Sequence, residues 1–81
     1  MIRTVYGKVS RVYKDFFVFQ VGAMGFKVFA AKRTLSRLPS PGEDEVLIFC
    51  HLKLKEDGVE LFGFLDEREL QFFELLVAVS G

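Results

Sequence analysis

Residues 46–64 read VLIFCHLKLKEDGVELFGF, two runs rich in branched and aromatic residues on either side of a short polar turn. The runs 46–54 and 59–64 predict two antiparallel strands, with the hairpin turn at Glu56, Asp57 and Gly58. Two adjacent carboxylates therefore lie at the tip of a two-stranded support. They form either a solvated polar turn or a charged tip directed at a partner, and the turn pattern alone leaves both open.

Three more strands are predicted upstream of this hairpin, at residues 2–14, 16–21 and 25–30. The first alternates apolar and charged positions, with Gly7 as a bend or bulge. A tight turn at Lys14 and Asp15 leads into the second strand. A turn at 22–25, with glycine available for positive φ at either end, leads into the third.

Two helical segments are predicted outside the strands. Residues 31–38 favour a short helical turn, which ends at Pro39 and a loop of Pro, Gly and acidic residues. Asp66 occupies an N-cap position with Glu69 three residues later, the arrangement of a capping box. After it, apolar residues recur at helical spacing and predict an amphipathic C-terminal helix: Leu70, Phe72, Phe73, Leu76 and Val77.

The order of these elements predicts a small closed barrel. Five strands with hairpin connections, and a segment inserted between the third and fourth, are too few for a two-sheet sandwich. A mainly β fold, a five-stranded OB-type Greek-key barrel with a C-terminal α-helix, fits best, and an SH3-like barrel is the alternative. We expect the barrel at 1–65 and the helix at 66–81.

Length and composition exclude several classes of protein. The chain has 81 residues, half of them apolar and ten of them Phe, which is enough for one domain with a real core. No apolar run reaches the roughly 18–20 residues of a membrane span, and the N-terminus lacks the apolar stretch of a signal peptide. The single Cys50 excludes an internal disulfide framework, fits a reducing cytoplasmic setting, and is expected to be buried.

The net charge is balanced, but basic and acidic residues are concentrated in different halves of the sequence. Net charge is zero, which argues against a generic basic nucleic-acid binder. Residues 38–81 hold three basic groups and ten acids. Residues 1–37 hold one acid, Asp15, and eight basic groups: Arg3, Lys8, Arg11, Lys14, Lys27, Lys32, Arg33 and Arg37. A surface with one basic and one acidic side is therefore a hypothesis.

Catalysis finds little support in the residues. His51 is the only histidine, and strand alternation places it on the opposite face of the sheet from Cys50. No phosphate-binding Gly-Lys-Ser/Thr loop is present. The acidic runs 43–45 and 56–57 are expected to be solvated rather than to hold a metal. We expect no catalytic site, no cofactor and no metal. Most strand phenylalanines are expected in the core, with one or two exposed for stacking against bases.

Several segments of the sequence occur in a distinctive order: the initial Met-Ile, Gly7, VGAMGFKV (21–28), LPSPGE (38–43), HLKLKED (51–57), FGF (62–64) and ELQFFELLVAVSG (69–81). This ordered set resembles the N-terminal domain of the bacterial Holliday junction branch-migration protein RuvA. Each segment is weakly specific, but the ordered set spans nearly the whole chain. Three details differ from the usual pattern: Gly58 replaces Ala, Lys55 replaces Arg, and the start at Arg3 is unusual.

The resemblance implies a function in homologous recombination and DNA repair. Members of the family form a homotetramer that holds a four-way DNA junction open and flat. A separate hexameric ATPase, RuvB, drives branch migration, and the resolvase RuvC resolves the junction. The chain would thus belong to the subunit without ATPase activity. Glu56 and Asp57 match the acidic pin that projects to the junction centre. Lys55, Arg11 and Lys14 are candidate contacts to the DNA backbone.

The resemblance also implies segments beyond this chain. In the family, helix-hairpin-helix segments that grip the DNA backbone follow residue 81, and a motor-binding domain comes later. Two alternatives remain from the residues themselves: a barrel that serves only protein–protein assembly, and an OB domain that binds RNA or single strands through surface aromatics.

Overall fold

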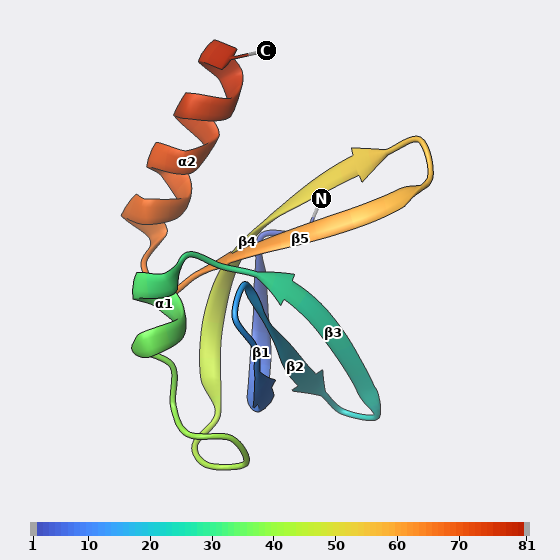
Figure 1. The fold of residues 1–81 in the computed structure, drawn as a ribbon, viewed down its shortest axis with the longest axis vertical. Coiled ribbons are helices and arrows are strands. Elements are labelled where there is room, and N and C mark those ends of the chain that lie inside the picture. The colour runs from blue at the N-terminus through green and yellow to red at the C-terminus, as the bar shows by residue number, and fades with distance from the viewer. Residues whose placement is uncertain (1, 81) are drawn as a thin grey trace.

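A computed structural model describes residues 2–80 of the chain. Five strands form one sheet, and two helices interrupt or follow them (Figure 1). In chain order the elements are β1 (Thr4–Val12), β2 (Phe16–Val21), β3 (Met24–Phe29), α1 (Lys32–Ser36), β4 (Val46–Lys55), β5 (Gly58–Phe64) and α2 (Glu67–Ser80).

The strands close into a barrel in the order β1-β2-β3-β5-β4, and β4 pairs back with β1. All neighbouring strands are antiparallel except β3 and β5, which pair in parallel at Val28–Leu61 and Phe29–Phe62. The connection between β3 and β4 contains α1, whose Leu35 packs against the core. The predicted OB-type barrel with a C-terminal helix is confirmed.

The core follows from the alternation of inward and outward residues along each strand. On β2, Phe17 and Phe19 are fully buried, while Phe16 and Val18, which alternate with them, are only half-buried. The buried hydrophobic residues of the barrel are Val9, Phe17, Phe19, Val28, Ile48, Cys50 and Leu61. Burial raises the pKa of the Cys50 thiol, and this side chain is the small buried residue that the sequence predicted.

Of the bend or bulge predicted at Gly7, the bulge lies elsewhere in β1. The register of β1 against β2 shifts between Val9 and Arg11, so the bulge lies three residues later. Gly7 itself is buried, and a Cβ built there would lie 2.2 Å from the backbone oxygen of Gln20. Glycine is therefore required at this position because the backbone of β2 approaches it closely.

The turn between β2 and β3 uses one of its two glycines for unusual backbone geometry. Gly22 has φ +59°, whereas Gly25 has no positive φ and already lies within β3. The strand boundaries differ from the prediction by one or two residues here and at β1. This outcome is common because the ends of strands depend on individual hydrogen bonds.

The start of α2 has half of the predicted capping box. Oδ1 of Asp66 accepts a hydrogen bond from the backbone N–H of Arg68 at 2.7 Å. The reciprocal bond from Asp66 N–H to Glu69 is not among the hydrogen bonds of residues 2–80, and the Glu69 carboxylate instead lies 3.9 Å from Arg37. A single capping contact is thus enough to define this helix end.

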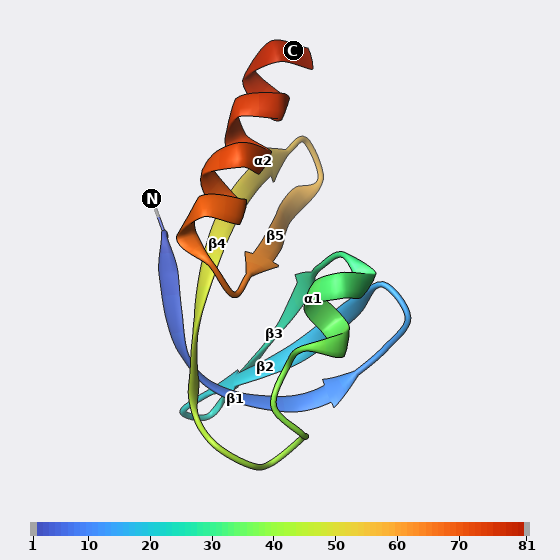
Figure 2. The same ribbon diagram turned by 90° about the vertical axis from the view of Figure 1, so that its left-hand side faces the viewer.

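Only part of the predicted apolar face of α2 is covered. Leu70 is buried and Phe73 half-buried, and α2 runs beside the β4–β5 hairpin (Figure 2). Phe72, Leu76 and Val77, three residues of the predicted apolar face, are exposed. Further exposed apolar residues on the helix are Leu75 and Val79. The helix therefore presents an apolar surface that the barrel does not cover.

Candidate nucleic-acid interface

The β4–β5 hairpin extends as a long arm away from β1 and β2 (Figure 1). Seven consecutive residue pairs join its strands, from Phe49–Phe64 to Lys55–Gly58. Glu56 and Asp57 alone form the loop between the last pair, and both side chains are exposed. The structure thus places the two carboxylates at the tip of an ordered ribbon.

The hairpin turn depends on glycine. Glu56 and Asp57 both have negative φ, because the only positive-φ residues among 2–80 are glycines. Gly58 has φ +152°, a value that side-chain-bearing residues rarely adopt. The ladder of paired residues, rather than packing by other elements, holds the tip, since all side chains from residue 53 to 59 are exposed.

A basic residue from a distant strand lies next to the tip. Lys27 of β3 and Lys55, Asp57 and Glu60 of the hairpin line one hollow of about 240 Å³. The Lys55 ammonium lies 3.4 Å from the Glu60 carboxylate, so this candidate DNA contact is already paired. Lys27 appeared in the sequence only as one of many basic residues, because the parallel pairing that brings β3 to β5 was not apparent.

Arg11 and Lys14 lie outside this hollow. Both side chains are exposed, and neither takes part in an ion pair among the described residues. Arg11 is opposite Val18 at the end of β1, and Lys14 is in the β1–β2 turn. The structure therefore separates these two candidates from the acidic tip, although both remain accessible to a ligand.

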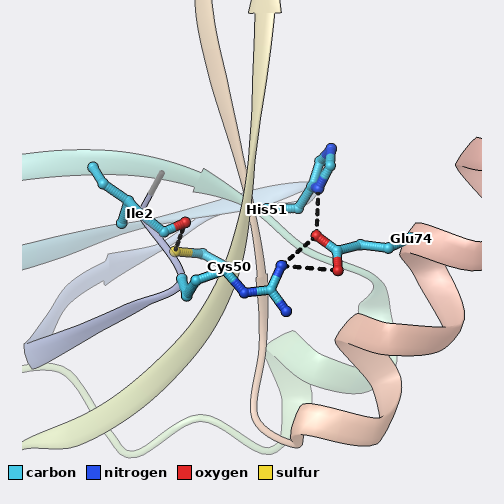
Figure 3. A network of polar contacts seen from close by, with 5 residues as sticks. Ile2, Cys50, His51 and Glu74 are labelled. Carbon is cyan, nitrogen blue, oxygen red and sulfur yellow. Dashed lines mark hydrogen bonds and ion pairs between the residues drawn. The ribbon is translucent and has the colours of Figure 1, made fainter.

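An ion-pair network connects α2 to the barrel (Figure 3). Glu74 of α2 accepts two hydrogen bonds from Nη1 of Arg3, at 2.9 Å and 2.7 Å, and its Oε2 lies 2.8 Å from Nδ1 of His51. Hydrogen bonds from Arg3 and then from His51 hold the pKa of Glu74 below its ordinary value. His51 thus has a structural role, and it faces away from the buried Cys50 as the strand alternation predicted.

The described residues show little that would support another type of site. Among residues 2–80, no three His, Cys, Asp or Glu side chains are grouped closely enough to hold a metal ion. No helix within that range is long and apolar enough to cross a membrane. The acidic run 43–45 is exposed in the loop before β4.

Comparison with known proteins agrees with this geometry. Residues 1–63 match the family model described as the RuvA N terminal domain. The chain belongs to this family. Similar proteins include the Holliday junction branch migration complex subunit RuvA of Chlorobium phaeobacteroides, 41% identical over 75 residues and covering 93% of this chain and 37% of the relative.

Two further RuvA subunits match the chain over all 81 residues. The protein of Rickettsia bellii is 41% identical, and the match covers 39% of its length. The protein of Clostridium perfringens is 33% identical, with 40% of its length covered. The chain thus spans about two fifths of the curated RuvA relatives that it matches. The RuvA resemblance inferred from the ordered segments is confirmed.

Proposed function

We propose that this chain is the N-terminal domain of a RuvA-type subunit that binds Holliday junctions and supports branch migration. Two observations support the proposal: its membership of the RuvA N-terminal family, and a pair of carboxylates at the tip of a projecting hairpin. Together they support the part of the proposal in which Glu56 and Asp57 form the acidic pin at the junction centre. The chain would act by shaping DNA, since the motor activity belongs to a partner.

The pin acts through repulsion. Two unit charges 4 Å apart interact by about 1 kcal/mol in water, and by more where water is excluded. Glu56 and Asp57 therefore disfavour phosphates near the tip. A continuous duplex across the centre would place phosphates there, whereas the strands of a junction turn away from it. Repulsion of this kind lowers affinity for the wrong DNA and so increases specificity.

A fourfold arrangement would concentrate this effect. In a RuvA-type homotetramer, four hairpins would bring eight carboxylates around the crossover. We include in the proposal the hexameric ATPase RuvB as motor and the resolvase RuvC as a later partner on the same junction. The proposal includes a location in the bacterial cytoplasm, which the free, buried Cys50 fits because thiols stay reduced there.

We also propose that α2 joins the barrel to the rest of a longer protein. The family match ends at residue 63, before α2 begins at Glu67. The helix presents an apolar surface, which includes Phe72, Leu75 and Leu76, that the barrel leaves exposed. Exposed apolar patches commonly mark interaction sites. Helix-hairpin-helix segments that follow residue 81 would cover this surface and grip the DNA backbone.

Site-specific cross-linking tests the location of the pin. A photoreactive amino acid is placed at position 57 in the full-length protein, and a control at position 44 in the exposed loop before β4. With a synthetic junction, position 57 is expected to cross-link to nucleotides at the crossover and position 44 to give a different pattern. Cross-links from position 57 that are spread along the arms would contradict the proposal.

A further inference from the structure

A row of aromatic rings crosses the outer surface of the barrel, separate from the core. Tyr13 stacks on Phe16 with ring centroids 4.5 Å apart and an interplanar angle of 17°. Phe16 meets Phe29 at 6.1 Å, and Phe29 meets Phe62 at 5.8 Å. These four rings come from the β1–β2 turn, β2, β3 and β5, so the row runs across the strands.

Strand alternation places these rings on the outside of the barrel. Phe17 and Val28 point inward and are fully buried, so their neighbours Phe16 and Phe29 point outward. At the far end of the row, α2 covers the rings, because Phe73 lies 5.2 Å from Phe62. The near end is open, since Tyr13 is 42% exposed. The row therefore ends in an accessible aromatic ring.

Two cations lie beside the open end of this row. Nζ of Lys27 is 4.5 Å from the centroid of Phe16 and 5.0 Å from that of Phe29. Val18 is opposite Lys27 on one side and opposite Arg11 on the other, so the two cations share one row of the sheet next to the rings. The ion pairs among residues 2–80 include neither cation.

A shallow recess adjoins the rings. It has a volume of about 270 Å³, and Phe29 and Phe62 of the ring row form part of its wall. Its other lining residues are mostly apolar: Asp15, Ala30, Ala31, Phe64 and Phe73. An unpaired base has two apolar faces and requires this kind of surface, whereas the bases of a duplex are already stacked on one another.

We propose that Tyr13, Phe16 and Phe29, with Lys27 and Arg11, form a stacking platform for unpaired bases of single-stranded DNA. A base stacks on the open face of Tyr13, and the two cations bind the phosphates that flank this base. Proteins that bind single strands without sequence preference combine aromatic rings, which stack on bases, with cationic side chains, which contact phosphates. The observations that support this platform are independent of the acidic tip. In the proposed function, the platform would bind the strands that are separated at the junction.

The test measures binding of the 81-residue chain to fluorescently labelled oligothymidylate of about ten nucleotides, within the range that one OB barrel covers. A duplex of the same length serves for comparison. The single strand is expected to bind more tightly. Tyr13→Ala should weaken single-strand binding by about fivefold or more, because stacking on one aromatic ring contributes that much per base. Tyr13→Phe, which keeps the ring, should restore most of the affinity.

Tyr6→Ala is the matched control. Tyr6, which lies in β1, is also an exposed tyrosine, but it is opposite Leu47 on β4 and outside the aromatic row. This variant should bind single strands like the parent. Lys27→Gln should reduce the slope of log affinity against log salt by about 0.7, the value for one phosphate contact on a single strand.

Three results would overturn the platform: no single-strand binding by the parent, duplex binding as tight as single-strand binding, or equal affinities for Tyr13→Ala and Tyr6→Ala. Circular dichroism confirms first that each variant is folded. Failure of the platform would leave the cross-links from position 57 unchanged. Conversely, failure of the pin would leave the effect of Tyr13→Ala unchanged, so the two proposals are tested separately.

Discussion

Gly63 is predicted to be a sensitive small residue of the barrel core, where an added methyl group would meet buried side chains. It lies in β5 between the half-buried Phe62 and Phe64, and a Cβ built on it would point into the core. That atom would lie 2.5 Å from Cγ1 of Val28, 3.1 Å from Cγ2 of Ile48 and 3.5 Å from Cζ of Phe17. Ordinary contacts begin near 3.4 Å. Gly63→Ala thus requires a shift of almost 1 Å by side chains that have no free space.

The expected cost follows from this overlap. Insertion of a methyl group into a packed core destabilises a protein by about 1–3 kcal/mol, and we expect the upper part of that range because Val28 is fully buried. For a domain of this size, each kcal/mol lowers the melting temperature by about 4–8 °C. Gly25→Ala is the control, because its Cβ would meet only the side-chain ends of the half-buried Gln20 and Val18, both at 3.3 Å.

Thermal unfolding followed by circular dichroism measures both variants. A second comparison identifies the cause: Val28→Ala removes the clashing methyl, so the double variant should lose less stability than the sum of the single variants. If Gly63→Ala is as stable as Gly25→Ala, or if the double variant is additive, the packing argument is wrong.

Three further predictions concern α2 and DNA binding. Folding lowers the pKa of Glu74, so its ion pairs stabilise the docked helix at pH values above the unfolded pKa of 4.5, and this stabilisation is lost as pH falls through the lower folded pKa. Glu74→Gln should therefore remove this part of the acid sensitivity, which denaturant unfolding at several pH values measures. Glu43→Gln is the control and should leave the acid sensitivity unchanged. Leu75→Ser should change the stability of the 81-residue chain by less than about 0.5 kcal/mol but should destabilise the full-length protein. Leu70→Ala should cost about 2–5 kcal/mol in both proteins. Equal effects of Leu75→Ser in the two proteins would contradict the role proposed for α2. The 81-residue chain should bind duplex and junction DNA only in the non-specific range of about 10⁻⁴–10⁻⁶ M with strong salt dependence, and sub-micromolar junction binding at physiological salt would contradict this.

The strands and the acidic tip were predictable because their signals are local. Period-two alternation marks each strand, and a polar turn between two such runs fixes the position of Glu56 and Asp57. The burial of Cys50 followed from its place in an apolar strand run, and alternation placed His51 on the opposite face of the sheet. Local patterns of this kind need no knowledge of which strands are neighbours.

The parts that were missed depend on contacts between distant segments. Arg3 and Glu74 are 71 positions apart, and nothing near either residue indicates its partner. Lys27 lies near the hairpin only because β3 and β5 pair in parallel. The role of Gly7 depends on the backbone of β2, and the exposure of Phe72 depends on where the barrel ends. Sequence periodicity gives the apolar stripe of α2 but not how much of it one partner covers.

The most direct test of the pin replaces both tip carboxylates in the full-length protein. E56Q with D57N keeps the size and polarity of the turn and removes two charges from each subunit. Affinities for a four-way junction and for a duplex are measured at one salt concentration, because phosphate contacts make both salt-dependent. E43Q with D44N, which removes two charges from the exposed loop before β4, is the matched control.

The account predicts that the tip variant binds duplex more tightly while its junction affinity changes less, so that the ratio of junction to duplex affinity falls. The loop variant should keep the ratio of the parent. If the tip variant discriminates junction from duplex as well as the parent does, Glu56 and Asp57 are a solvated turn and the pin is contradicted.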